Sequence, residues 1–471
     1  MDPLYENGLG RSALEFVLAS TFERQAKLPD LHAYSERELP DLIEEFPLPQ
    51  YGIGSLGSVR TLWDLCNRYA ANTIGPRYFD FVIGGVLPAA LAADWVTATF
   101  DQNAAGRVTG DLATEVEILV MRWLKELLGL TADWHGVMVP SATYGNVAGL
   151  ACARQWCGQQ IAIDVVMDGA RGLPPIKVVG SSFVHPSVEK ALQMLGMGRK
   201  CLTRFDLTDP DTGLARMREA LADSGPAIVI ASAGEVNGGE FDPITRLAQV
   251  ARETGAWLHV DAAFGMIAAF DPNLAENLDG IHLADSIAAD GHKWLNVPYD
   301  SGFALIREKE IANRTFGMPS APYLEDLTGA SPGFASLGPD ASRRARAFPV
   351  FVALLAYGTA GIRNMIKRQM KAISRLVALI DDSTDYRILI RPTLPIVTFR
   401  AEPPGILEDE LDELNQAIAS KVNATGHFAV GVTMVSGRKA LRVALLNWGI
   451  TDVIAHELFA ELSATLADMD V

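Results

Sequence analysis

Few cysteines, a deficit of positive charge and the absence of a long apolar run set the first limits on this 471-residue chain. Its four cysteines form no CxxC pair and no regular framework, which argues against a disulfide-stabilised secreted domain and against a zinc site. With 40 basic and 57 acidic residues, the net charge of −17 would repel nucleic-acid phosphates and anionic lipid headgroups. We therefore expect a cytoplasmic protein with no metal site, no nucleic-acid partner and no membrane role.

Hydrophobic residues are nonetheless plentiful, at 49% of the chain, and charged residues make up 21%. This composition is typical of a soluble globular enzyme. The most apolar stretch, residues 81–93, is interrupted by Pro88 and is well short of the ~20 residues that a membrane span needs. The first residues lack a basic start followed by an apolar run, so no secretory signal is expected.

The middle of the chain alternates short apolar runs with helical segments, a pattern that predicts an α/β fold with a mostly parallel sheet. Ligands bind beyond the carboxyl ends of the strands in such sheets. Helical spacing is clear at 12–26 and 111–130, and again from 347 onwards. The expected strands are the runs at 136–140, 176–179, 227–231, 257–260, 286–289 and 302–306.

Three parts are expected along the sequence. The pattern of residues 1–75 predicts a helical arm. Its Pro-rich, acidic passage at 29–49 is typical of a segment that wraps around a second subunit. Residues 76–360 predict the large domain, and residues 361–471 predict a small α+β domain. The segment Gly52-Ile-Gly-Ser-Leu-Gly57 fits GxGxxG, but no strand precedes it and no suitably placed acidic residue follows, so we interpret it as a Gly-rich turn.

Two residues at expected strand ends carry the chemistry. Asp261 ends the run at 257–260, and Lys293 follows the run at 286–289. Taken singly, Asp261 could be a helix cap and Lys293 a solvated loop lysine. Together they supply what pyridoxal 5′-phosphate requires, a lysine for the Schiff base and a carboxylate that keeps the pyridine nitrogen protonated.

A phosphate cradle and a histidine accompany this pair. Ser141 and Thr143 precede a helix expected at 146–156, and helix N-termini bind anions; an ordinary Ser/Thr N-cap is the alternative. His185 follows the strand expected at 176–179 and would face the same crevice. A core or capping histidine is the alternative there.

In these motifs the sequence resembles the group II pyridoxal-phosphate-dependent amino-acid decarboxylases, which include glutamate, cysteine sulfinate and aromatic-L-amino-acid decarboxylases. The resemblance runs over roughly residues 70 to 360. It implies fold type I, an amino-acid substrate, and a homodimer whose active sites are shared between subunits. The segments that carry it are Pro76-Arg-Tyr-Phe79, Phe183-Val-His185-Pro, Phe241-Asp-Pro-Ile, Trp257-Leu-His-Val-Asp261-Ala-Ala and His292-Lys293-Trp-Leu-Asn-Val-Pro-Tyr-Asp-Ser-Gly.

The resemblance also implies roles. Lys293 would form the Schiff base, Asp261 would pair with the pyridine nitrogen, and His185 would stack on the ring. Tyr323, in a Gly-, Pro- and Ser-rich stretch that suits a mobile lid, would protonate the reacting carbon. The remaining expected cofactor contacts are Ser141, Ala142, Thr143 and His292 for the phosphate and Ala263 for the ring.

Two positions depart from the family pattern. After the third expected strand, where relatives commonly carry a pair of threonines, this chain reads Ala233-Gly-Glu235-Val236-Asn237, and Glu235 is expected either to line the site or to face solvent in a turn. Asp290 stands where several relatives have asparagine; phosphate would repel it, so we expect it to point elsewhere or to bond a backbone N–H.

Alternative functions stay open from sequence. An aminotransferase, a carbon–carbon lyase or a cofactor-binding protein without turnover would use the same Asp261 and Lys293. The substrate side chain is open between aromatic and acidic. An acidic substrate would require an arginine or lysine counter-charge, whereas Gly84 and Gly85 could make room for an aromatic ring. The available arginines are Arg77, Arg107, Arg343, Arg344 and Arg346.

Overall fold

The computed structural model describes residues 10–34, 39, 41–318 and 333–469, and these form two compact units. One unit comprises Met1–Ile83, Lys371–Leu389 and Val397–Val471, and the other comprises Gly84–Met370 and Ile390–Ile396. The N-terminal helices therefore group with C-terminal residues. The three-part division expected from sequence stays a prediction.

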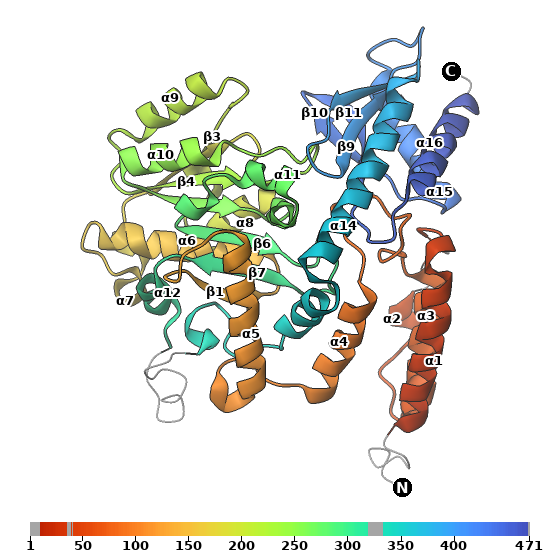
Figure 1. The fold of residues 1–471 in the computed structure, drawn as a ribbon, viewed down its shortest axis with the longest axis horizontal. Helices are drawn as coiled ribbons and strands as arrows, with labels where there is room; N and C mark the ends of the chain where they lie inside the picture. The colour runs from red at the N-terminus through yellow and green to blue at the C-terminus, as the bar shows by residue number, and fades with distance from the viewer. Residues whose placement is uncertain (1–9, 35–38, 40, 319–332, 470–471) are drawn as a thin grey trace. The chain divides into compact units, whose positions relative to one another are not determined.

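The second unit is built on a seven-stranded sheet in the order β1-β7-β6-β5-β4-β2-β3. Figure 1 shows this sheet with its strands β1, β3, β4, β6 and β7 labelled. All the neighbouring strands are parallel except β7, which runs antiparallel to both β1 and β6, so the expectation of a mostly parallel sheet is confirmed. The strands are β1 (His135–Val139), β2 (Lys177–Ser181), β3 (Leu202–Phe205), β4 (Ala227–Ser232), β5 (Ala256–Asp261), β6 (Ser286–Asp290) and β7 (Gly302–Ile306).

Burial explains which strands the sequence revealed. Every residue of β4, β6 and β7 is buried, because helices cover both faces, and such strands are continuous apolar runs. Strand β3 has no buried residue and reads Leu-Thr-Arg-Phe, so no apolar run marked it. The helices of this unit are α4 (Pro88–Phe100), α5 (Arg107–Leu127), α6 (Ala142–Gln159), α7 (Val165–Asp168), α8 (Pro186–Met194), α9 (Pro210–Leu221), α10 (Ile244–Thr254), α11 (Pro272–Ala275), α12 (Lys309–Phe316) and the first part of α14 (Ala347–Asp381).

Helix α6 lies directly on the central strands because two glycines one turn apart let it approach. A Cβ added at Gly145 would lie 2.7 Å from the Phe303 carbonyl oxygen, and one at Gly149 would lie 2.7 Å from Nδ1 of His259. The helix begins at Ala142, with Ser141 as its N-cap, which corrects the expected start at residue 146. Asn146 is therefore inside the helix and faces the sheet.

In the first unit, α1 (Arg11–Lys27) and α3 (Gly54–Tyr69) pack through an edge contact between Phe16 and Trp63. In the described residues no strand precedes Gly52, as expected, but Gly54–Gly57 form the first turn of α3, so the interpretation of the whole segment as a Gly-rich turn is wrong. The C-terminal part forms a four-stranded sheet in the order β10-β11-β9-β8, which confirms the small α+β region. Its elements are β8 (Tyr386–Ile390), β9 (Ile396–Ala401), α15 (Leu411–Thr425), β10 (Gly431–Val435), β11 (Arg438–Ala444) and α16 (Asp452–Ala467), and a short α2 (Leu42–Glu45) precedes α3.

Helix α14 is, within the described ranges, the one helix long and apolar enough to cross a membrane. Its backbone breaks at Gly358, where φ is 60° and ψ is −180°. Its second half is rich in Arg and Lys, and Gln369 accepts a hydrogen bond from the indole of Trp294 at 2.7 Å. These features are typical of a packed helix in a globular protein. The absence of a membrane role and the cytoplasmic location stay predictions.

Candidate active site

The loops that follow β5 and β6 meet at one edge of the sheet, where a ligand of a parallel sheet is expected. Asp261 lies level with Ala288 in the parallel pair. Beyond the strands, the Ala262 N–H donates to the Ala288 carbonyl at 2.8 Å and the Asp290 N–H donates to the Ala263 carbonyl at 3.3 Å. The structure therefore brings the segments 261–263 and 290–293 together, as the sequence predicted.

Asp261 is a buried carboxylate, 6% exposed, whose partners among the described residues are neutral. One oxygen accepts from the side-chain amide of Asn146 at 3.0 Å, and the other accepts from the Ala263 N–H at 3.1 Å. A buried carboxylate that meets only neutral donors is costly unless a cation joins it. A protonated ring nitrogen is such a cation, so Asp261 fits its expected role. Because Asp261 also accepts from the distant Asn146 side chain, it is not simply a helix cap.

Behind Asp261 and Asn146, the hydrogen bonds continue into the interior through His259, Ser286 and Trp257. His259 Nε2 lies 2.8 Å from Oδ1 of Asn146, and its Nδ1 lies 2.8 Å from the Ser286 hydroxyl, which accepts from the Trp257 indole at 2.8 Å. Complete burial lowers the pKa of His259 to about 4, although Asp261 opposes this change. His259 is therefore neutral at physiological pH.

Lys293 lies on the neighbouring loop and its ammonium group is 3.1 Å from Oδ2 of Asp290. The other oxygen of Asp290 accepts from the Ala142 N–H at 2.6 Å and lies 3.3 Å from Nε2 of His292. Asp290 thus bonds a backbone N–H, one of the two expected arrangements. With its side chain 23% exposed, Lys293 is a partly buried, paired lysine, and the alternative of a solvated loop lysine is wrong.

His292 is buried beside Lys293 and accepts from the Ser301 N–H through Nδ1 at 3.1 Å. Its ring stacks on Tyr299, with ring centres 4.1 Å apart. Burial lowers the pKa of His292, whereas burial and Asp290 raise the pKa of Tyr299. Gly84 packs against the backbone of the Lys293 loop and has no room for a side chain, because a Cβ there would lie 1.8 Å from the Lys293 carbonyl oxygen.

The N-terminus of α6 is the place where the sequence predicts an anion site, and that role stays a prediction. Ser141 is the N-cap residue of α6, as the alternative expected, but it makes no side-chain capping bond. The hydroxyls of Ser141 and Thr143 and the first-turn N–H groups are suited to a phosphate, although Asp290 already takes the N–H of Ala142. Gly302, the first residue of β7, lets the chain pass close to Ser141, since an added Cβ would lie 2.6 Å from the Ser141 backbone.

His185 precedes α8 and caps it, which confirms the capping alternative without removing the ring from solvent. Its Nδ1 accepts from the Ser187 N–H at 3.1 Å and lies 2.8 Å from the Ser187 hydroxyl. Because Nδ1 is an acceptor, we assign the ring proton to Nε2. The ring is exposed, and in this assignment its proton is on Nε2, while the roles expected for His185 stay predictions.

Glu235 is 5% exposed, so the expectation of a solvent-facing turn residue is wrong. Its carboxylate accepts the backbone N–H groups of Asn237, Gly238 and Gly239 within its own turn. The side chain therefore folds the loop that follows β4. Tyr323 and its neighbours at 319–332 lie outside the described residues, so the role expected for Tyr323 stays a prediction.

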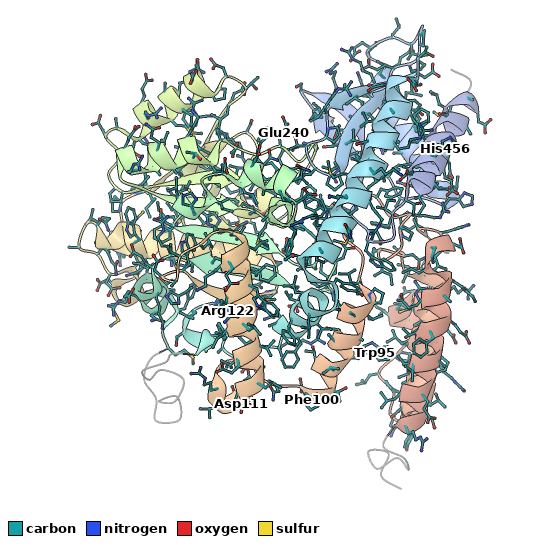
Figure 2. The ribbon with its side chains drawn as sticks, in the orientation of Figure 1. Trp95, Phe100, Asp111, Arg122, Glu240 and His456 are labelled. Atoms are coloured by element: carbon teal, nitrogen blue, oxygen red, sulfur yellow. The ribbon has the colours of Figure 1, made fainter. Side chains whose placement is uncertain are left out.

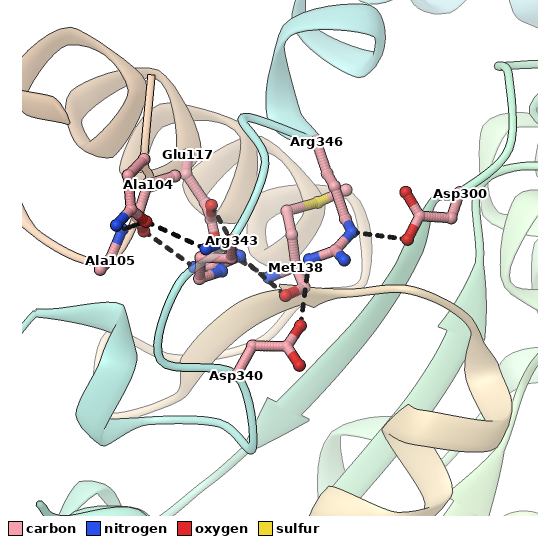
Figure 3. Close-up of polar contacts among 9 residues, drawn as sticks. Ala104, Ala105, Glu117, Met138, Asp300, Asp340, Arg343 and Arg346 are labelled. Atoms are coloured by element: carbon pink, nitrogen blue, oxygen red, sulfur yellow. Dashed lines mark hydrogen bonds and ion pairs between the residues drawn. The ribbon is translucent and has the colours of Figure 1, made fainter. Parts of the chain in front are cut away.

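The arginines considered as counter-charges each meet a carboxylate of this chain. In Figure 3, Arg343 contacts both oxygens of Glu117 at 2.8 and 3.0 Å and also the carbonyl oxygens of Met138 and Ala104. In the same view, Arg346 lies between Asp300 and Asp340. The other pairs are Arg77 with Glu457, Arg107 with Glu115, and Arg344 with Asp94.

Comparisons with known proteins agree with this geometry. The chain is 26% identical over 427 residues to an aromatic-L-amino-acid decarboxylase of Bacillus atrophaeus, covering 88% of this chain and 86% of that protein. It is 27% identical over 384 residues to an L-2,4-diaminobutyrate decarboxylase of Acinetobacter baumannii, covering 78% and 74%. The crystal structure of Oryza sativa TDC with PLP and tryptamine superposes with a TM-score of 0.90 at 22% identity, covering 99% of both chains.

That likeness of structures confirms the fold type I architecture. Residues 69–402 match the pyridoxal-dependent decarboxylase conserved domain, which is well over half of the chain. The chain therefore belongs to the pyridoxal-dependent decarboxylase family, a family of amino-acid decarboxylases whose cofactor is pyridoxal 5′-phosphate.

Proposed function

We propose that this chain decarboxylates an aromatic L-amino acid, with Lys293, Asp261 and His185 as its catalytic residues. The observation that carries the proposal is the buried Asp261 carboxylate, which among the described residues meets neutral donors only, on the strand next to the Lys293 loop. The amine of Lys293 would hold the cofactor. When bound, pyridoxal phosphate supplies an electron sink for the pair left by the departing carboxylate.

The chain's own residues have separable tasks in this proposal. Asp261 would keep the proton on the ring nitrogen, which preserves the sink. The N-terminus of α6, with Ser141 and Thr143, would hold the phosphate and so fix the ring in the crevice. His185 would stack on the ring and hold a proton at Nε2 for the reacting carbon. Tyr323 is proposed, from the sequence resemblance alone, as the second proton donor.

An aromatic rather than an acidic substrate is supported by the charges that are already paired. An acidic side chain would need a cation, but each arginine considered for that purpose has a carboxylate partner in this chain. Arg343 is fully buried against Glu117, and Arg346 is 10% exposed between two aspartates. The relative from Bacillus atrophaeus carries the name of an aromatic-amino-acid enzyme, which agrees with this choice.

We also propose a homodimer with shared active sites. In the second unit, apolar side chains on α4 and α5 are exposed, and Figure 2 labels Trp95 and Phe100 on α4, which are 37% and 69% exposed. In the first unit, α1 and α3 expose apolar residues as well, among them Leu14, Phe22 and Leu62 at 62–70%. Exposed apolar surface of this kind marks interfaces. Sedimentation of Phe100→Asp should give a monomer with reduced activity, whereas a monomeric parent chain would reject the dimer.

The deciding experiment measures carbon dioxide and amine release from a panel of L-amino acids by the protein loaded with pyridoxal phosphate, with Lys293→Ala as control. The panel includes aromatic and acidic amino acids and 2,4-diaminobutyrate. Release from an aromatic substrate alone, absent in the control, supports the proposal. Release from an acidic or diamino substrate instead overturns the substrate class, and aldehyde in place of amine overturns the proton-donor roles.

A further inference from the structure

Asn146 lies at the centre of the hydrogen bonds that join the two residues proposed to face the cofactor ring. The side chain has no exposed surface. Its amide nitrogen donates to Oδ2 of Asp261 at 3.0 Å and to the hydroxyl of Ser187 at 3.3 Å. Its amide oxygen lies 2.8 Å from Nε2 of His259. Both amide hydrogens and the oxygen are therefore used.

The ends of this chain of hydrogen bonds fix its direction. At one end, the indole of Trp257 can only donate, and it donates to Ser286. At the other end, the ionised carboxylate of Asp261 can only accept. His259 must then carry its proton on Nε2 and donate to the oxygen of Asn146. The orientation of the Asn146 amide follows, with its nitrogen towards Asp261 and Ser187.

We propose that Asn146 is a positioning residue that aligns Asp261 and His185 with each other. The Ser187 hydroxyl that accepts from Asn146 lies 2.8 Å from Nδ1 of His185, so one amide reaches both residues. This inference rests on the proposed function, because it assumes that the cofactor ring contacts Asp261 and His185.

A neutral amide suits this position better than a cation. Arginine or lysine at 146 would neutralise Asp261 and compete with the ring nitrogen, whereas an amide orients the carboxylate and leaves its charge in place. The branch through Ser187 adds a hydroxyl donor to Nδ1 of His185, beside the Ser187 backbone N–H, and so holds the ring in place with its proton on Nε2. Asn146 thus serves two groups on different elements, β5 and the start of α8.

Two variants separate the branches. Asn146→Ala removes both, and Ser187→Ala removes only the branch to His185 while leaving the bonds of Asp261 intact. Ser187 is only partly buried, so its variant is expected to fold. Thermal unfolding of each apoprotein verifies folding. The readouts are cofactor affinity, from titration of apoprotein with pyridoxal phosphate, the pH midpoint of the visible band of the bound cofactor, and kcat with its pH profile.

For Asn146→Ala we expect cofactor affinity to fall about tenfold, the scale of a hydrogen bond to a charged group, with a shifted pH midpoint. For Ser187→Ala we expect affinity within about twofold of the parent and a lower kcat with an altered pH profile. A folded Asn146→Ala protein with the parent's affinity and midpoint would overturn the inference. So would a Ser187→Ala protein with an unchanged kcat profile.

Failure of the proposed function looks different. A parent protein that binds pyridoxal phosphate but releases carbon dioxide from no amino acid rejects the decarboxylation proposal. The affinity and midpoint of Asn146→Ala would then still test whether Asn146 positions Asp261.

Discussion

Two aspartates end neighbouring strands of the same sheet, both nearly buried, yet their surroundings differ in charge. Within the described part of the chain, Asp261, 6% exposed at the end of β5, meets only the Asn146 amide and the Ala263 N–H. Asp290, 4% exposed at the end of β6, meets the Lys293 ammonium group, His292 and the Ala142 N–H. The chain itself balances the charge of Asp290 and leaves that of Asp261 for a ligand.

Burial alone therefore does not mark a functional carboxylate. What separates Asp261 from Asp290 is that Asp261 has no positively charged partner among the described residues. A paired carboxylate such as Asp290 holds chain segments together, here the start of α6 and the Lys293 loop. An unpaired one is tolerated where a bound cation repays its desolvation. Asp261 should therefore matter through its charge, and Asp290 mainly through the hydrogen bond that it accepts.

The largest expected effect separates the two residues. Asp261→Asn keeps the size of the side chain but removes the charge that would hold the ring nitrogen protonated. We expect kcat/KM for carbon dioxide release to fall on the order of 10³-fold, the scale of losing one preorganised electrostatic contact in a buried site. A loss smaller than about tenfold would show that the charge of Asp261 is not what the reaction uses.

A third carboxylate, Glu117, tests the paired case at full burial. Arg343→Met would leave Glu117 buried with its charge uncompensated, so we expect the free energy of unfolding to fall by about 3–5 kcal/mol. The matched control is Arg346→Met, whose partners Asp300 and Asp340 are 38% and 27% exposed and can rehydrate. Urea unfolding measures both. Equal losses in the two variants would contradict the dependence on burial.

The sequence was sufficient to predict those features of the fold that depend on residues close together along the chain. Buried strands are apolar runs, and the carboxyl ends of parallel strands meet, so the amino-acid pattern was enough to place Asp261 and Lys293 at one edge of the sheet. Asn146 could not be paired with Asp261 across 115 positions, because that contact depends on how closely α6 approaches the sheet. The turn that encloses the Glu235 carboxylate is equally invisible in sequence.

The alternation along β5 is a signal for the supporting histidine. Trp257, His259 and Asp261 alternate along this strand, so their side chains share one face of the sheet, and Gly145 and Gly149 mark the helix that covers that face. The alternation could have suggested that His259 supports Asp261. The short β3 was missed for the opposite reason, since none of its residues is buried.

The pH dependence of stability tests the surroundings of Asp261 through its neighbour His259. Its pKa is lowered from 6.5 to about 4, so the unfolded chain takes up a proton below about pH 6.5 while the folded chain does not. This contribution to stability is full above that pH and is lost as the pH falls towards 4, by up to about 3 kcal/mol. Urea unfolding at about pH 7 and about pH 4.5 should show a weaker pH dependence for His259→Gln than for the parent. An identical dependence would mean that His259 does not titrate in this way.

The smallest effect is expected for Asp290→Asn. Asparagine keeps an oxygen that can accept the Ala142 N–H, and the ion pair that is lost leaves Lys293 with a side chain 23% exposed, which water can reach. We therefore expect cofactor affinity and kcat/KM within about tenfold of the parent. The same cofactor titration and carbon dioxide assay, run beside Asp261→Asn, measure the difference. A loss in Asp290→Asn that equals or exceeds that of Asp261→Asn would reverse the roles, because the carboxylate paired within the chain would then be the one whose charge the reaction requires.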